Sequence, residues 1–88
     1  MSNTPTRTSM TASDLAEILF CCGLQASDRP STEQVRAAID DRIGACGGDR
    51  SGCVELVAQE AGDHPESYRA RMRWALGTVA RAYPGTAA

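Results

Sequence analysis

Four cysteines carry the most distinctive chemistry in this 88-residue chain: Cys21, Cys22, Cys46 and Cys53. Thiols can bind zinc, form disulfides or act as nucleophiles. Their spacing matches none of the C-x-x-C patterns that are typical of zinc and redox sites. Adjacent residues on a helix point about 100° apart, so Cys21 and Cys22 are poorly placed to share one metal ion. We therefore expect no metal site and no bound cofactor.

Cys46 and Cys53 are the pair that we consider for a disulfide or a thiol switch. They flank a short polar loop, and Cys53 would lie near a helix N-terminus, where thiols are often activated. Alternatively, both are small buried apolar side chains, as free cysteines commonly are. If the helices alternate up and down, Cys21 and Cys22 lie at the opposite end of the bundle. The two cysteine groups would then be more than about 15 Å apart.

The remaining polar motifs favour structural roles over catalysis. His64 is the only histidine, in the run Asp-His-Pro-Glu, where we expect a helix cap or an exposed side chain. The loop at 47–52 is rich in glycine and opens a helix, but it lacks the spacing of a phosphate-binding loop. Since no Ser/His/Asp set can be assembled, we expect that the chain is not an enzyme.

Apolar residues recur at intervals of three and four, which predicts helices at roughly 11–22, 31–46, 51–61 and 64–83. Ser31 with Gln34 forms one expected capping box, and Asp63 with Glu66 forms another. Gly62 is expected to end the third helix. The fold class is therefore all-α, a small up-down bundle of about four helices joined by short loops.

The domain organisation follows from the same pattern. We expect residues 1–10 to form a flexible arm, 11–84 a single helical domain and 85–88 a flexible tail. Each helix should turn one apolar stripe inward: Leu15, Ile18, Leu19 and Cys22; Val35, Ile39, Ile43 and Cys46; Cys53, Val54, Val57, Ala58 and Ala61; Tyr68, Met72, Leu76, Val79 and Tyr83. Arg42 falls near the second stripe, where its stem could pack while its head turns outward.

Charge is divided unevenly along the chain. All nine basic residues are arginine, and the net charge is −2. Residues 10–63 carry a formal charge of −6, whereas residues 64–88 carry +3. A basic helix could bind nucleic acid, but the acidic helices beside it would repel a phosphate backbone. We therefore consider nucleic acid an unlikely partner.

The last helix carries the expected interaction residues. Trp74 lies opposite the inward stripe of that helix, and tryptophan and arginine are enriched where proteins bind each other. Ala70 and Gly77 would let another helix approach, while Arg73 and Arg81 would face acidic groups. The alternative is that the chain's own helices cover Trp74 on both sides.

These patterns predict a small interaction or regulatory module that forms a homodimer through its last helix or binds another protein. A DNA-associated regulator that uses the arginines of that helix is one alternative, and a thiol-redox protein that uses Cys46 and Cys53 is another. The first residues do not resemble a secretory signal, and no apolar run is long enough to cross a membrane. We therefore expect a cytoplasmic protein without membrane contact.

Overall fold

The computed structural model describes residues 10–47 and 49–85, and these contain four α-helices, one 3₁₀ turn and no strand. The elements are α2 (Ala12–Phe20), η1 (Ala26–Asp28), α3 (Thr32–Ala45), α4 (Ser51–Asp63) and α5 (Pro65–Ala82). This confirms the all-α class and the small four-helix bundle. The expected arm and tail lie largely outside the described residues. Met10, expected in the arm, instead packs against the core.

Side-chain caps begin the first two helices. At α2, the Thr11 hydroxyl accepts from Asp14 N at 3.2 Å, and the Asp14 carboxylate accepts from Thr11 N at 3.1 Å. Ser31 and Gln34 make the same reciprocal pair at α3, with distances of 3.1 and 2.8 Å. Such caps satisfy backbone donors that a helix leaves free, so these helix starts are encoded in local sequence.

The α4–α5 turn is tighter than the sequence predicts. Helix α4 continues through Gly62 to Asp63, and α5 begins at Pro65, so only His64 separates the two helices. The predicted capping box of Asp63 with Glu66 is therefore wrong, because Asp63 is still part of α4. Pro65 begins α5 without a side-chain cap, since its fixed φ angle already suits a first helical turn.

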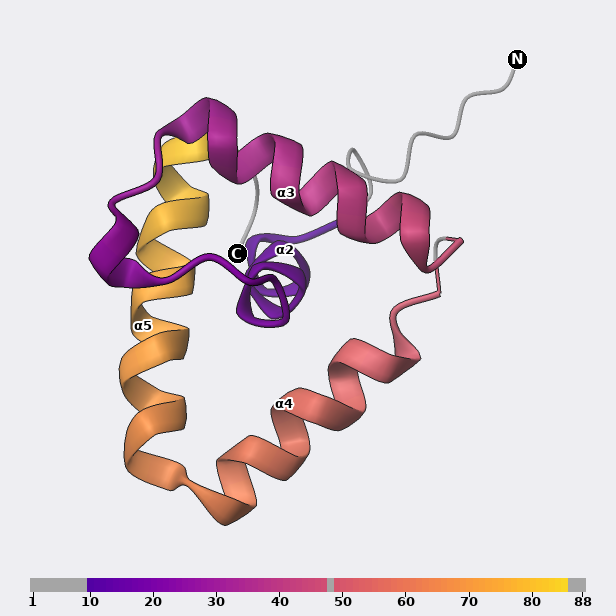
Figure 1. The fold of residues 1–88 in the computed structure, drawn as a ribbon, viewed down its shortest axis with the longest axis vertical. Helices are drawn as coiled ribbons and strands as arrows, with labels where there is room; N and C mark the ends of the chain where they lie inside the picture. Colours follow the sequence, from indigo (N-terminus) through magenta and orange to yellow (C-terminus); the bar gives the residue numbers. More distant parts are fainter. Residues whose placement is uncertain (1–9, 48, 86–88) are drawn as a thin grey trace.

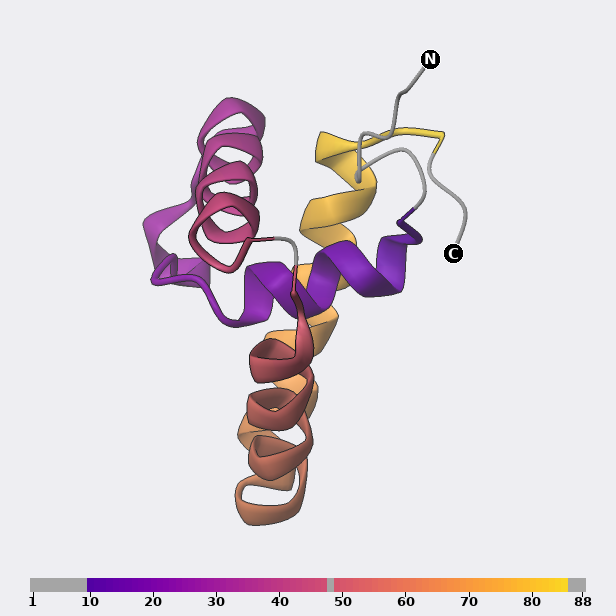
Figure 2. The ribbon, with the colours of Figure 1, turned by 90° about the vertical axis from the view of Figure 1, so that its right-hand side faces the viewer.

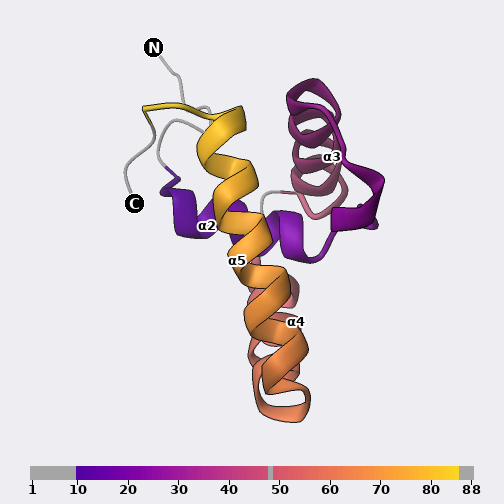
Figure 3. The same ribbon diagram turned by 90° about the vertical axis from the view of Figure 1, so that its left-hand side faces the viewer.

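The helix axes are not all parallel. In Figure 1, α2 is seen end-on at the centre, while α3, α4 and α5 surround it. Figure 2 shows α2 crossing α5 near the middle of the molecule, and Figure 1 shows α4 and α5 diverging from the turn that joins them. Figure 3 shows α5 from the other side, passing α2 and continuing beside α3. Helices α2 and α5 cross at the centre of the fold, and each of them contacts all three of the other helices.

The core forms where α2, α3 and the second half of α5 meet. Its members are Leu15, Ala16, Ile18, Leu19, Val35, Ile39, Ala75, Val79 and Ala82. The predicted inward faces of α2 and α3 are largely confirmed by this set. Helix α4 contributes no member, although its Cys53 and Val57 are buried elsewhere.

Helix α5 is rotated relative to the predicted inward stripe. It buries Ala75, Thr78, Val79 and Ala82, whereas Leu76 is 41% exposed. The prediction that Leu76 faces the core is therefore wrong. The small side chains on this face let α5 approach α2 closely where the two helices cross. The face of α5 that carries them is therefore the buried one. The rotation also brings Trp74 against the edge of the core.

Candidate functional site

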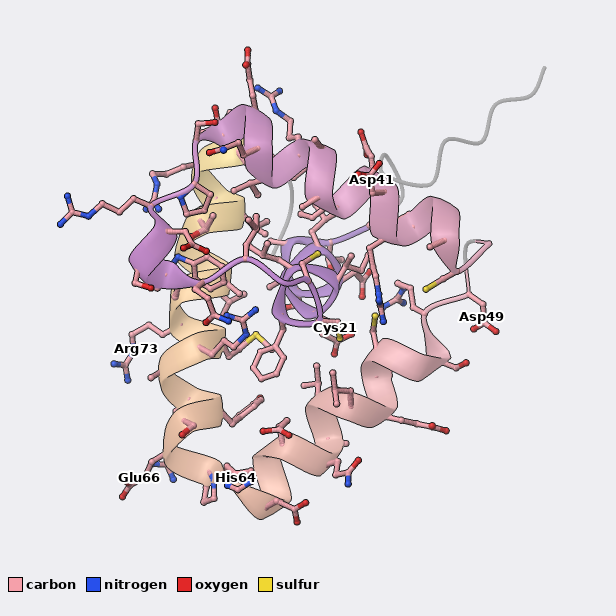
Figure 4. All side chains as sticks on the ribbon, viewed as in Figure 1. Cys21, Asp41, Asp49, His64, Glu66 and Arg73 are labelled. Carbon is pink, nitrogen blue, oxygen red and sulfur yellow. The ribbon has the colours of Figure 1, made fainter. Side chains whose placement is uncertain are left out.

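The C-terminus of α2 meets the N-terminus of α4, and this brings distant cysteines together. The Sγ atom of Cys21 lies 3.7 Å from the carbonyl oxygen of Cys53. The expected separation of more than about 15 Å between the two cysteine groups is therefore wrong. It assumed parallel helices, whereas α2 crosses α5 (Figure 2), and Figure 4 shows Cys21 on the side of α2 that faces α4.

All four cysteines are free thiols in this structure. Cys53 is buried, and the other three are half-buried. The Cys22 thiol donates to the carbonyl oxygens of Ile18, at 3.3 Å, and Ala38, at 3.7 Å, so it bridges α2 and α3. Cys46 and Cys53 line one small cavity, and a disulfide between them stays a prediction.

That cavity is lined by Ile18, Arg42, Ile43, Cys46, Asp49, Arg50 and Cys53. Its volume of about 10 Å³ is at the lower limit for one water molecule. The half-buried Arg42 lines this cavity, and its Nε atom is buried there. A hydrogen bond to the Cys53 sulfur, together with the charge of that group, raises the pKa of Arg42. The cavity is therefore a junction of packed side chains with no room for a substrate.

The two cysteines that directly follow α2 are held as protonated thiols at neutral pH. Burial, followed by the hydrogen bond to Cys53, raises the pKa of Cys21 to about 12. Burial also raises the pKa of Cys22, partly offset by the nearby charge of Arg42. Because the thiolate is the form that attacks electrophiles and binds metals, neither group is a ready nucleophile at neutral pH.

Ion pairs reinforce the same junction. The Nη1 atom of Arg50 lies 3.4 Å from Asp14 Oδ1 and 3.3 Å from Glu17 Oε1. Asp14, Glu17 and Cys21 are spaced at i, i+3 and i+7, so they follow one face of α2. We call these three residues, with Arg50 and Cys53, the α2–α4 seam. The seam joins α4 to α2, and α4 has no residue in the core cluster.

Arg71 has a structural role at this place that the sequence analysis did not predict. Its guanidinium donates to the carbonyl oxygens of Phe20, Cys22 and Leu24 at distances of 2.9–3.0 Å. Its central carbon lies 5.4 Å from the centroid of the Phe20 ring and 5.0 Å from that of Trp74. Helix α2 has no basic residue in its last turn. This absence indicates in the sequence that a donor from another element could bind the carbonyl groups at its end.

The predicted interaction residues on α5 have different environments. Ala70, Arg73, Gly77 and Arg81 are exposed, and Figure 4 shows Arg73 pointing away from the molecule. Trp74 is half-buried and packs against the core and Arg71, so the chain itself covers part of it. Among the described residues, the ion pairs are made by Arg50, and none joins an arginine of α5 to a carboxylate.

Several kinds of site receive no support within residues 10–47 and 49–85. No group of three or more histidine, cysteine, aspartate or glutamate side chains there is placed to hold a metal ion. None of the helices in those ranges is long and apolar enough to span a membrane. No family model, curated protein or solved structure matches this chain. The function must therefore be argued from the geometry of the chain itself.

Proposed function

We propose that this chain is a small cytoplasmic interaction module that self-associates through the exposed side of α5. Arg69, Arg73 and Arg81 extend from this side, with Ala70 and Gly77 between them, and we call these five residues the α5 basic face. All five are exposed. The observation that carries the proposal is that the three arginines have no ion-pair partner among the described residues.

The α5 basic face has room for a second helix. A Cβ atom built on Gly77 would meet only Arg81 Nη1, at 3.9 Å. Leu76, 41% exposed, borders the face, and the accessible part of Trp74 borders it as well. A partner could therefore combine close helix contact with apolar contact at the edges, an arrangement typical of protein interfaces.

A second copy of the chain is the partner that the charge distribution favours. Glu33 and Asp41 on α3, and Glu55 on α4, are exposed carboxylates on the same molecule. Since residues 10–63 carry −6 and residues 64–88 carry +3, one copy offers the acidic surface that the α5 basic face of another requires. Complementary charge of this kind guides association and fixes orientation.

Sedimentation equilibrium over a range of protein concentrations tests this proposal. We expect the wild type to dimerise and the double variant Arg73→Glu/Arg81→Glu to dimerise at least tenfold more weakly, a change of about 1.4 kcal/mol. Arg36→Glu is the control, because Arg36 is exposed on α3 and undergoes the same change of charge per substituted residue. Trp74→Ala is unsuitable, since Trp74 also supports Arg71 and the core. A wild type that is still monomeric at about 1 mM would overturn the proposal.

Nucleic acid is a second candidate partner, because the three arginines are exposed together on one helix and lack carboxylate partners in the described residues. The exposed acidic residues of α3 and α4 weigh against it. Retention on duplex DNA at low salt, lost as salt is raised, would favour this second function. No retention at low salt would exclude it.

A further inference from the structure

We propose that Cys21 and Cys53 form a reversible disulfide that joins the end of α2 to the start of α4, with a low-molecular-weight disulfide as the oxidant. This pairing differs from the Cys46–Cys53 pair suggested by the sequence. It also does not depend on self-association, because both cysteines lie in the α2–α4 seam of one chain.

The geometry brings these two residues together. The Sγ atom of Cys21 is 3.7 Å from the Cys53 carbonyl oxygen, to which the thiol donates. A disulfide requires the two backbones to approach within about 7 Å. A sulfur 3.7 Å from the partner's carbonyl oxygen places the two Cα atoms within about 9 Å of each other, so at most a small shift of the backbone is needed.

The rest of the α2–α4 seam keeps the two cysteines in register. Arg50 pairs with Asp14 and Glu17, which lie two turns and one turn before Cys21, respectively. Arg50 is the N-cap residue of α4 and precedes Cys53 by three residues, so the charged contact and the sulfur contact lie close together at the start of that helix. The ion pairs therefore position the two thiols before any covalent bond forms.

The other cysteines have different roles. The Cys22 thiol already bridges the carbonyl groups of Ile18 and Ala38 on the far side of α2. Cys46 follows α3 and shares the small cavity with Cys53, so it is the competitor for the same partner. Arg42 lies against Cys53 from the α3 side. A test must therefore distinguish Cys21 from Cys46 as the partner of Cys53.

The reaction is a two-step thiol–disulfide exchange. Cys21, the more exposed of the pair, loses its proton and attacks one sulfur of the oxidant, and the departing thiolate takes up that proton. Cys53 then loses its proton and attacks the Cys21 sulfur of the mixed disulfide, which expels the second thiolate as a second thiol. Two protein thiols are oxidised, and the small disulfide is reduced to two thiols. Because burial keeps Cys21 protonated, the exchange is slow at neutral pH and accelerates in alkali.

Peptide mapping after oxidation distinguishes the possible pairings. The folded protein is incubated with oxidised glutathione at pH 9, the remaining thiols are alkylated, and the chain is cleaved by trypsin without reduction. Trypsin cleaves after arginine but not at Arg29, which precedes Pro30. Cys21 and Cys22 therefore fall in peptide 8–36, Cys46 in 43–50 and Cys53 in 51–69. We expect two alkylated thiols and a link between peptides 8–36 and 51–69.

Two single variants identify the cysteine of peptide 8–36 that reacts. Cys21→Ser should abolish the link, whereas its neighbour Cys22→Ser should leave it intact. Circular dichroism confirms that each variant is folded before oxidation. A link between peptides 43–50 and 51–69 overturns the proposal in favour of Cys46. Four alkylated thiols after prolonged oxidation, or a link that survives Cys21→Ser, overturn it as well.

Discussion

Two regions of this small molecule are held together by different forces. Where α2, α3 and the second half of α5 meet, fully buried Leu15, Leu19, Val35, Ile39 and Val79 form a continuous apolar cluster. Helix α4 has no part in that cluster and leaves Val54 and Leu56 about two-fifths exposed. The first region is stabilised by a continuous apolar cluster, whereas α4 combines two buried side chains, Cys53 and Val57, with a few polar contacts.

Those contacts are concentrated at the two ends of α4. The α2–α4 seam holds its first turn, and the tight turn at His64 joins its last turn to α5. Surface ion pairs contribute about 0–1 kcal/mol each. A helix attached in this way should open more readily than the core, and a disulfide in the seam would have its largest effect there.

The same substitution placed in each region tests this comparison most strongly. Val35→Ala should lower the free energy of unfolding by about 2–3 kcal/mol, since it leaves a cavity among tightly packed neighbours. Val57→Ala on α4 should cost about 1 kcal/mol, because fewer buried groups surround it. Urea denaturation measures both values, and the exposed Val54→Ala is the control, expected within about 0.5 kcal/mol of wild type. An equal loss of unfolding free energy at Val35 and Val57 would show that α4 is packed as tightly as the core.

Arg71 connects α5 to the end of α2, between the core cluster and the α2–α4 seam. Its loss should lower the free energy of unfolding by an amount between those expected for the two regions. Arg71→Ala removes three hydrogen bonds to backbone carbonyls and two ring contacts, so it should destabilise the fold by about 1.5–3 kcal/mol. The emission maximum of Trp74 should also shift, because its ring loses contact with the Arg71 guanidinium.

Two further variants separate the shape of Arg71 from its charge. Arg71→Lys keeps the charge but cannot span three carbonyl groups, so it should recover less than half of the loss. Arg73→Ala, on the exposed side of the same helix, should change the stability by no more than about 0.5 kcal/mol. Full recovery by lysine would show that charge alone explains the contact.

A pH dependence is expected at the junction of the two regions. The pKa of Cys21 is raised from 9.0 to about 12 in the fold, so folding favours the protonated thiol. Its contribution to stability is complete below pH 9 and is lost as the pH rises towards 12. Urea midpoints between pH 7 and 11 should therefore fall more steeply for wild type than for Cys21→Ser. Parallel curves would show that Cys21 is not held as the protonated thiol.

Local sequence determined the helices of this protein. The apolar spacing predicted all four within a few residues, and the Ser31–Gln34 cap formed as expected because its bonds join residues three apart. The division of charge between the acidic body and the basic last helix is likewise a property of the sequence alone. These features depend on neighbours in the chain, which a sequence pattern describes directly.

Only the tertiary structure decided which face of each helix meets which partner. The crossing of α2 over α5 selected the small residues of α5 for burial and left Leu76 exposed. The same crossing brought Cys21 to Cys53, 32 positions away, and Arg71 to Phe20, 51 positions away. The apolar periodicity of a helix predicts which side chains share a face, but it does not predict the angle at which that helix crosses another. The crossing angle follows from the packing of all four helices at once, so it cannot be read from any one of them.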